Sequence, residues 1–106
     1  MASLIPLEHP GILLKEEFIE PLEISVYAVA KGTGIPQTAL SEIIKGKRNI
    51  SAINALKLSK YFAVSENYFM NIQTRYDLDL AKEKAKKPLS KIKPLQNHRN
   101  HGTLEV

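Results

Sequence analysis

One segment, which runs from Ser25 to Arg48, constrains the fold of this chain more than any other: SVYAVAKGTGIPQTALSEIIKGKR. Ser25 can cap the first free N–H groups of a helix that buries one stripe of apolar side chains. That stripe consists of Val26, Val29 and Ala30. Gly34 stands where the chain must turn sharply, because glycine adopts a positive φ without strain, and Pro36 favours the first turn of a second helix. The segment therefore predicts two short amphipathic helices joined by a tight turn.

The second of these helices is predicted to run from about Pro36 to Lys45. Its apolar residues share one face, at i, i+3 and i+4 spacing: Leu40, Ile43 and Ile44. Its outer face carries an amide, two hydroxyls, a carboxylate and an ammonium, which are groups that address base edges and phosphates in a major groove. We expect contacts to base edges from Gln37, Thr38, Ser41 and Glu42, and contacts to phosphate from Lys45, Lys47 and Arg48. The pattern at residues 26–45 is typical of a helix-turn-helix that binds DNA.

An ordinary αα-hairpin in a small bundle is the alternative interpretation. Any buried hairpin needs a small residue at the crossing and a glycine at the corner, and any surface helix has a polar outer face. The joint spacing of the small, turn and apolar positions favours DNA binding, because basic residues also follow where the second helix ends. Those positions are Ala30, Gly34, Ile35, Leu40 and Ile43.

Composition limits the chain to one small domain. Its 106 residues are 43% hydrophobic but only 7% aromatic, which suits a modest helical core rather than a large enzyme fold. The sequence has no cysteine, which excludes disulfides, thiolate zinc sites and cysteine nucleophiles. The N-terminal MASLIPLEHP has no basic leader, and no apolar stretch approaches the length of a bilayer span. We therefore expect a cytoplasmic protein without a membrane segment.

Charge is distributed unevenly along the chain, beyond what the net charge of +4 indicates. Residues 1–24 carry several glutamates against the single lysine Lys15, whereas residues 25–76 are mainly basic. A cluster of cations on the helix-turn-helix side favours a polyanionic partner through counterion release. The acidic segment should face away from phosphate, and simple solvation of a helix face explains it equally well.

Three further helices complete the predicted layout. One opens at Pro10 and ends before Pro21, with Leu14 and Phe18 facing inward. A second is capped by Ser51 and places four residues on one face: Ala55, Leu58, Ser59 and Phe62. A third is capped by Ser65 and carries Phe69, Ile72 and Tyr76 at i, i+3 and i+7. No window shows strand alternation. The predicted fold is all-α, a compact domain of five helices over residues 1–85.

The composition changes after residue 80. The remainder, AKEKAKKPLSKIKPLQNHRNHGTLEV, is rich in lysine, contains two prolines and has few large apolar residues. Such a segment cannot bury enough apolar surface to form a packed core. We expect the last helix to fray near Lys86 and residues 86–106 to form a basic, disordered, mobile tail.

At several positions the chain resembles the HigA-type antitoxins, also called virulence-associated protein I, within the Cro and phage-repressor (XRE) helix-turn-helix class. The resemblance covers roughly residues 9–80 and extends beyond the helix-turn-helix itself. The matching segments are HPG at 9–11, EEFIEPLEIS at 16–25, YAVAKGTGIP at 27–36, EIIKGKRNIS at 42–51, ALKLSKYF at 55–62 and NIQTRYDL at 71–78.

This resemblance implies a lambda-repressor-like domain and a dimeric repressor that binds operator DNA. It also implies that the protein autoregulates its operon and neutralises a partner toxin, a HigB-type ribonuclease that cleaves messenger RNA at the ribosome. Two positions depart from the wider class. Val26 stands where many members have a glutamine that touches phosphate, so backbone N–H groups would have to supply that contact. Ala39 could at most meet a thymine methyl group.

The dimer and toxin surfaces can be nominated from residue types. A two-fold dimer must present its recognition helices about 34 Å apart, so its interface must lie elsewhere. Our candidates are the aromatic-rich residues Tyr68, Phe69, Ile72 and Tyr76, for which burial in the core is the alternative. A ribonuclease that binds RNA should be basic, so we expect it to dock on Glu16, Glu17 and Glu20.

Other functional classes have little support in the sequence. The histidines His9, His98 and His101 lie next to no predicted nucleophile or carboxylate pair, which argues against an enzyme. The HRNH spacing is a weak metal signal in a flexible segment, so we expect no metal and no cofactor. A helix-turn-helix repressor without a toxin partner, or a domain used only for protein contacts, remains an alternative.

Overall fold

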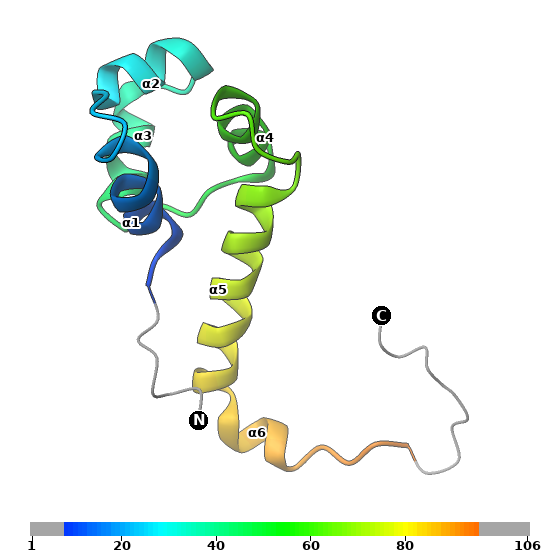
Figure 1. The fold of residues 1–106 in the computed structure, drawn as a ribbon. Helices are drawn as coiled ribbons and strands as arrows, with labels where there is room; N and C mark the ends of the chain where they lie inside the picture. Colours follow the sequence, from blue (N-terminus) through cyan, green and yellow to red (C-terminus); the bar gives the residue numbers. More distant parts are fainter. Residues whose placement is uncertain (1–7, 96–106) are drawn as a thin grey trace.

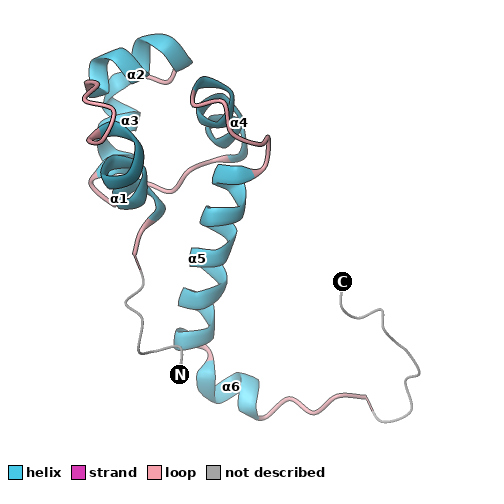
Figure 2. Ribbon diagram, in the orientation of Figure 1, coloured by secondary structure: helices cyan, strands magenta, loops and turns pink. Residues whose placement is uncertain are grey.

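The chain folds into helices joined by short turns (Figures 1 and 2). This computed structural model describes residues 8–95, and the expectations for residues 1–7 and 96–106, including those for His98 and His101, lie outside the described residues. Within residues 8–95 no strand occurs, and no helix is long and apolar enough to cross a membrane. The elements are α1 (Pro10–Leu14), η2 (Lys15–Ile19), α2 (Val26–Thr33), α3 (Gln37–Ile44), α4 (Ala52–Tyr61), α5 (Tyr68–Lys84) and α6 (Lys86–Ser90).

The first helix is α-helical in its first half and π-helical in its second. Within η2 the Glu20 N–H donates to the carbonyl oxygen of Lys15, five residues earlier, at 2.9 Å. The wider turn changes which side chains lie beneath one another. Leu14 is buried as predicted and Phe18 packs against the core, but Ile19, which α-helical spacing does not select, is buried as well. The π-turn therefore adds one apolar residue to the core.

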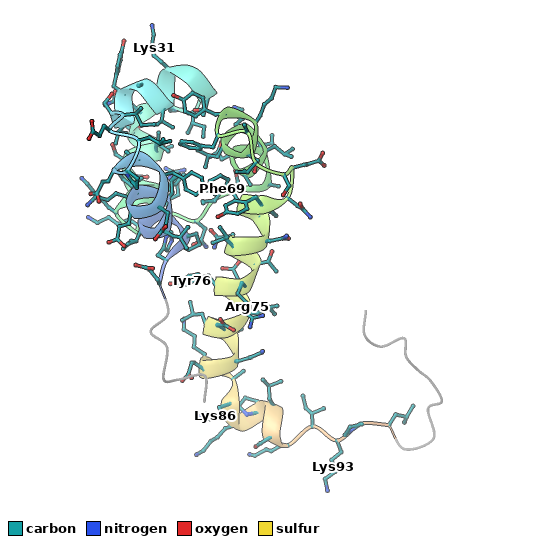
Figure 3. The ribbon with its side chains drawn as sticks, viewed as in Figure 1. Lys31, Phe69, Arg75, Tyr76, Lys86 and Lys93 are labelled. Atoms are coloured by element: carbon teal, nitrogen blue, oxygen red, sulfur yellow. The ribbon has the colours of Figure 1, made fainter. Side chains whose placement is uncertain are left out.

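The core lies where α1, α2, α3, α4 and the first turns of α5 meet. Phe69 of α5 is its largest fully buried side chain, and Figure 3 shows it among side chains of α1 and α4. Three rings surround it, with centroid distances of 5.2 Å to Phe18, 6.2 Å to Phe62 and 5.1 Å to Tyr68. The buried apolar residues are Leu14, Ile19, Val29, Ala30, Ile35, Leu40, Ile43, Ile50, Ala55, Leu58 and Phe69.

Serine caps distinguish the starts of α4 and α5. The Ser51 hydroxyl accepts a hydrogen bond from the Asn54 N–H at 3.2 Å, so the predicted cap of α4 is confirmed. The predicted cap at Ser65 is wrong. Helix α5 begins at Tyr68 with Asn67 as its N-cap residue, and the Ser65 hydroxyl instead donates to Asn67 Oδ1 at 3.3 Å. Ser and Asn side chains make such local bonds in turns, and here the turn delays the helix.

Helix α5 continues beyond the core, and α6 projects from its end (Figure 1). The expectation of a tail without regular structure after residue 85 is wrong for Lys86–Ser90, which form α6 as a sixth α-helix. Ala85 lies between α5 and α6 and interrupts the helical conformation, with φ −104° and ψ 19°. Pro88 is the third residue of α6, where a missing N–H leaves no intrahelical hydrogen bond unmade. This short helix therefore tolerates a proline at that position.

Candidate nucleic-acid interface

Hydrogen bonds hold the turn between α2 and α3 in one conformation. Gly34 adopts a φ of 81°, the left-handed conformation predicted from its place in the sequence, and its N–H donates to the Ala30 carbonyl at 2.8 Å. The Thr33 hydroxyl donates to the Val29 carbonyl at 2.7 Å and accepts from the Ile35 N–H at 3.1 Å. One threonine side chain thus joins the end of α2 to the start of the connection to α3.

The two faces of α3 differ as the sequence predicts. Leu40 and Ile43 are fully buried, and Ala39 is half-buried against the core. Helix α1 lies so close to this inner face that a Cβ atom on Gly11 would overlap the carbonyl oxygen of Ile43. The opposite face is open to solvent. It presents the exposed Gln37, Thr38 and Glu42 and the half-buried Ser41.

A Schellman motif ends α3 and leads into a basic loop, residues 46–49. Gly46 has a φ of 78°, and its N–H donates to the Ile43 carbonyl at 2.9 Å. The Lys47 N–H donates to the Glu42 carbonyl, also at 2.9 Å, which completes the motif. Cations at this end of a helix are favoured by its dipole. The exposed basic side chains gathered here are Lys45, Lys47 and Arg48.

The Glu42 carboxylate pairs with the Arg48 guanidinium. Arg48 Nε and Nη2 lie 2.8 Å and 2.7 Å from the same atom, Glu42 Oε1. Both side chains are about half exposed, so the pair contributes on the order of 0–1 kcal/mol to folding. Its consequence is geometric, because it fixes one cation of the basic loop beside a carboxylate on the outer face of α3.

Gln73 of α5 holds the far end of the basic loop, and sequence reasoning missed it. Its side chain is only 2% exposed, and its Oε1 accepts a hydrogen bond from the Ile50 N–H at 2.8 Å. Its Nε2 donates to Asp77 Oδ1 at 2.9 Å. The signal was available, since residue 73 lies four after Phe69 and three before Tyr76, on the buried face of α5.

His9 ties the start of α1 to the same loop. Its Nδ1 accepts from the Gly11 N–H at 2.9 Å, so the other ring nitrogen, Nε2, carries the proton and donates to Asn49 Oδ1 at 3.2 Å. Its ring lies edge-on to that of Tyr76, with centroids 5.2 Å apart. The sequence indicated this role only indirectly, because a proline at the first helical position makes the preceding residue the cap.

The nominated dimer residues have intramolecular neighbours. Phe69 is fully buried and belongs to the core rather than to a surface. Tyr68 lies edge-on to Phe18 at 5.8 Å, Tyr76 contacts His9, and Ile72 packs against the core. All three are half-buried, so only their outer edges are available to a second chain.

The nominated toxin residues lie on the surface of the first helix and just after it. Glu16, Glu17 and Glu20 are all exposed. Glu20 Oε2 lies 3.8 Å from Lys15 Nζ, an exposed ion pair, so part of the negative charge is offset locally. In the described part of the chain, no group of three or more His, Cys, Asp or Glu side chains could hold a metal ion.

Comparison with known proteins agrees with this geometry. The chain matches the helix-turn-helix family over residues 15–69. Virulence-associated protein I of Dichelobacter nodosus is 37% identical to it over 91 residues, which cover 86% of this chain and 83% of that protein. Antitoxin HigA-1 of Vibrio cholerae is 31% identical over 85 residues, which cover 80% of this chain and 80% of that protein.

A solved structure shares the fold as well as the sequence. The Pseudomonas aeruginosa antitoxin HigA, solved with the higBA promoter, aligns with a TM-score of 0.79 and 33% sequence identity. The match covers 85% of this chain and 99% of that one. The resemblance therefore spans nearly the whole of that protein rather than the helix-turn-helix alone.

Proposed function

Because this chain belongs to the helix-turn-helix family, in the group of virulence-associated protein I and the HigA-type antitoxins, we propose that it is the antitoxin of a type II toxin-antitoxin module. It binds operator DNA and represses its own operon, and it neutralises a partner toxin, a HigB-type ribonuclease that cleaves messenger RNA. This family is a class of DNA-binding antitoxins and repressors, not of enzymes. Operator DNA and a toxin that cleaves messenger RNA are both found in the bacterial cytoplasm, so we propose that location for the protein.

The observation that carries DNA binding is the open polar face of α3, which ends in exposed cations on a loop of fixed conformation. A recognition helix needs both parts, since base edges give sequence preference and phosphate contacts give affinity. In this proposal Gln37, Thr38, Ser41 and Glu42 face the bases, and Lys45, Lys47 and Arg48 meet the phosphates.

Two substitutions test these roles separately. Gln37→Ala should weaken binding to the operator by about 1–3 kcal/mol and leave binding to random DNA nearly unchanged. Lys47→Ala should weaken binding to both duplexes and reduce the slope of log affinity against log salt by about 1. Fluorescence anisotropy with promoter DNA and a random duplex of equal length measures both. An equal loss on the two duplexes for Gln37→Ala would refute the base-contact assignment.

The operator-binding form is proposed to be a two-fold homodimer. One recognition helix addresses only a few base pairs, so two copies are needed for a specific site. The proposed interface runs along α5, through the outer edges of Tyr68, Ile72 and Tyr76, which share one stripe at i, i+4 and i+8. Tyr76→Glu should shift the protein to monomer in sedimentation experiments and shorten the DNA footprint to one half-site, whereas Leu78→Glu, on the opposite side of the helix, should do neither. A wild-type monomer at micromolar concentration would contradict the proposal.

The toxin is proposed to dock on the acidic face of the first helix. Exposed rim charges act mainly on association, because they steer a partner of opposite charge. Replacing Glu16 and Glu17 by lysine should therefore slow toxin association and weaken its salt dependence, with a smaller effect on dissociation. The charge-matched control replaces two other exposed glutamates by lysine, Glu66 in the turn before α5 and Glu83 near the end of α5. Wild-type association kinetics in the double variant at low salt would move the toxin site elsewhere.

A repressor of the same class without a toxin partner is the second candidate. The fold and the DNA face serve both functions equally, so only the partner separates them. Co-purification with the product of the adjacent gene decides the matter. The antitoxin proposal requires a small protein that arrests growth unless this chain is expressed with it, and it fails if no neighbouring product behaves so.

A further inference from the structure

The pairing of Glu42 with Arg48 joins two groups whose proposed contacts on DNA differ. The hydrogen bond from Arg48 Nε and the close contact of Nη2 both end on Glu42 Oε1, which leaves Oε2 as an acceptor at the outer face of α3. Arg48 has five N–H donors, and the pair uses only those on Nε and Nη2. Each partner can therefore make a further contact without breaking the pair.

A carboxylate in this position opposes binding to most DNA. It is repelled by phosphates, and it offsets the charge of an arginine that would otherwise release counterions. The exception is a base edge that donates a hydrogen bond, namely the N4 amino group of cytosine or the N6 amino group of adenine in the major groove. There the carboxylate gains a charge-assisted bond in return for its lost hydration.

We propose that Glu42 is a specificity-determining residue that acts partly through Arg48, by lowering affinity for non-operator DNA more than for the operator. This inference rests on the proposed operator-binding function and concerns how that same face selects its site. The carboxylate restrains the guanidinium in the free protein and on random DNA. On the operator, a donor from cytosine or adenine engages Oε2, and the remaining N–H groups of Arg48 meet phosphate.

The backbone makes Glu42→Gln an informative test. The Schellman bond from Lys47 ends on the main-chain carbonyl of Glu42, so the substitution leaves the path of the basic loop intact. We expect binding to a random duplex to tighten about threefold, with a salt slope steeper by about 1. We expect binding to the promoter duplex of the chain's own operon to stay unchanged or weaken, so that the ratio of the two affinities falls by about threefold or more.

Two controls separate this role from a change in net charge. Glu66→Gln removes a negative charge from the exposed turn before α5 and should leave the affinity ratio unchanged. In an Arg48→Gln background, Glu42→Gln should tighten random DNA by less than it does in the wild type, because part of its effect passes through the guanidinium. A fall in the ratio for Glu66→Gln, or additive effects of Glu42→Gln and Arg48→Gln, would overturn the proposal.

Lys47→Ala distinguishes a failed inference from a failed function. If Lys47→Ala weakens binding to both duplexes but Glu42→Gln leaves their affinity ratio at the wild-type value, the DNA interface stands and the selective role of Glu42 is refuted. If Lys47→Ala changes neither affinity, the interface lies elsewhere and both proposals fall. Anisotropy titrations at several salt concentrations, with the two duplexes and each variant, give all of these outcomes.

Discussion

The two halves of α5 have different surroundings although they form one helix. Phe69 and Gln73 in the first half are 0% and 2% exposed, whereas Leu78 in the second half is 52% exposed. Figure 3 shows Arg75 and Tyr76 at the border, below the side chains that surround Phe69. Beyond α5 the contrast grows, since Ile92 is 68% exposed.

This difference shows where the fold obtains its stability. The first half is held by burial and by a buried hydrogen bond to Ile50, which directly follows the basic loop, while the second half has a short-range pair, Arg75 Nε to Asp79 Oδ2 at 3.4 Å. Such a pair stabilises a helix by only about 0.2–0.5 kcal/mol. The second half is helical because the first half nucleates it. Its exposed apolar side chains are consequently available to a partner.

The largest effect should come from a backbone contact within the first region. A Cβ at Gly11 would overlap the carbonyl of Ile43, and neither backbone can retreat without separating α1 from α3. Gly11→Ala should lower the free energy of unfolding by about 3 kcal/mol or more, as measured by urea titration. Gly32→Ala is the matched control, because its Cβ would meet only the ring of Tyr61, which is 37% exposed and can turn away. Equal losses for the two variants would contradict this reasoning.

Gln73 should give the next largest effect. Gln73→Leu keeps the volume but removes the acceptor of the Ile50 N–H, which is buried away from water. A buried donor without a partner costs about 1–3 kcal/mol, so unfolding should become easier by about that amount. Asp77→Asn tests the exposed end of the same chain of bonds and should change stability much less. If both substitutions have the same small effect, the hydrogen bond from the Ile50 N–H to Gln73 does not stabilise the fold measurably.

The serine hydroxyls at the starts of α2 and α4 should each contribute less to stability than Gly11 or Gln73. The hydroxyls of Ser25 and Ser51 accept N–H groups of α2 and α4, at 3.0 Å and 3.2 Å, so each substitution by alanine should cost about 1 kcal/mol. Ser65→Ala should cost less, since that hydroxyl bonds only to Asn67 Oδ1. Thermal unfolding at one protein concentration ranks the three variants. A loss at Ser65 equal to the others would show that its bond to Asn67 stabilises the protein as much as a helix cap does.

Local rules predicted the features that depend on neighbouring residues. The left-handed turn at Gly34, the caps at Ser25 and Ser51 and the buried face of α3 all follow from short spacings, and the structure confirms them. The DNA contacts nominated on the outer face of α3 remain predictions. The confirmed features and the DNA contacts have one thing in common: side-chain identity and helical period are sufficient to predict them.

Features that depend on distant segments could not be predicted in the same way. The π-turn buries Ile19 because of the packing around it, and an α-helical period does not indicate it. The pairing of Glu42 with Arg48 requires the Schellman turn between them, and the bond from Gln73 to Ile50 joins residues far apart in sequence. Phe69 was assigned to two possible surroundings, core or interface, because one chain alone does not show which face a neighbour covers.

The smallest expected effect concerns the end of the chain. We propose that residues 1–85 form the folded domain and that the rest is an extension, since the described residues of α6 and those just after it are exposed apart from half-buried Ala85 at its start. A chain ending at residue 85 should therefore match the free energy of unfolding of the full chain within about 0.5 kcal/mol. It should also have the same urea dependence, because the slope follows the surface exposed on unfolding. A loss above 1 kcal/mol would show that residues 86–106 pack on the domain. The exposure that begins in the second half of α5 would then not extend to the segment that follows the helix.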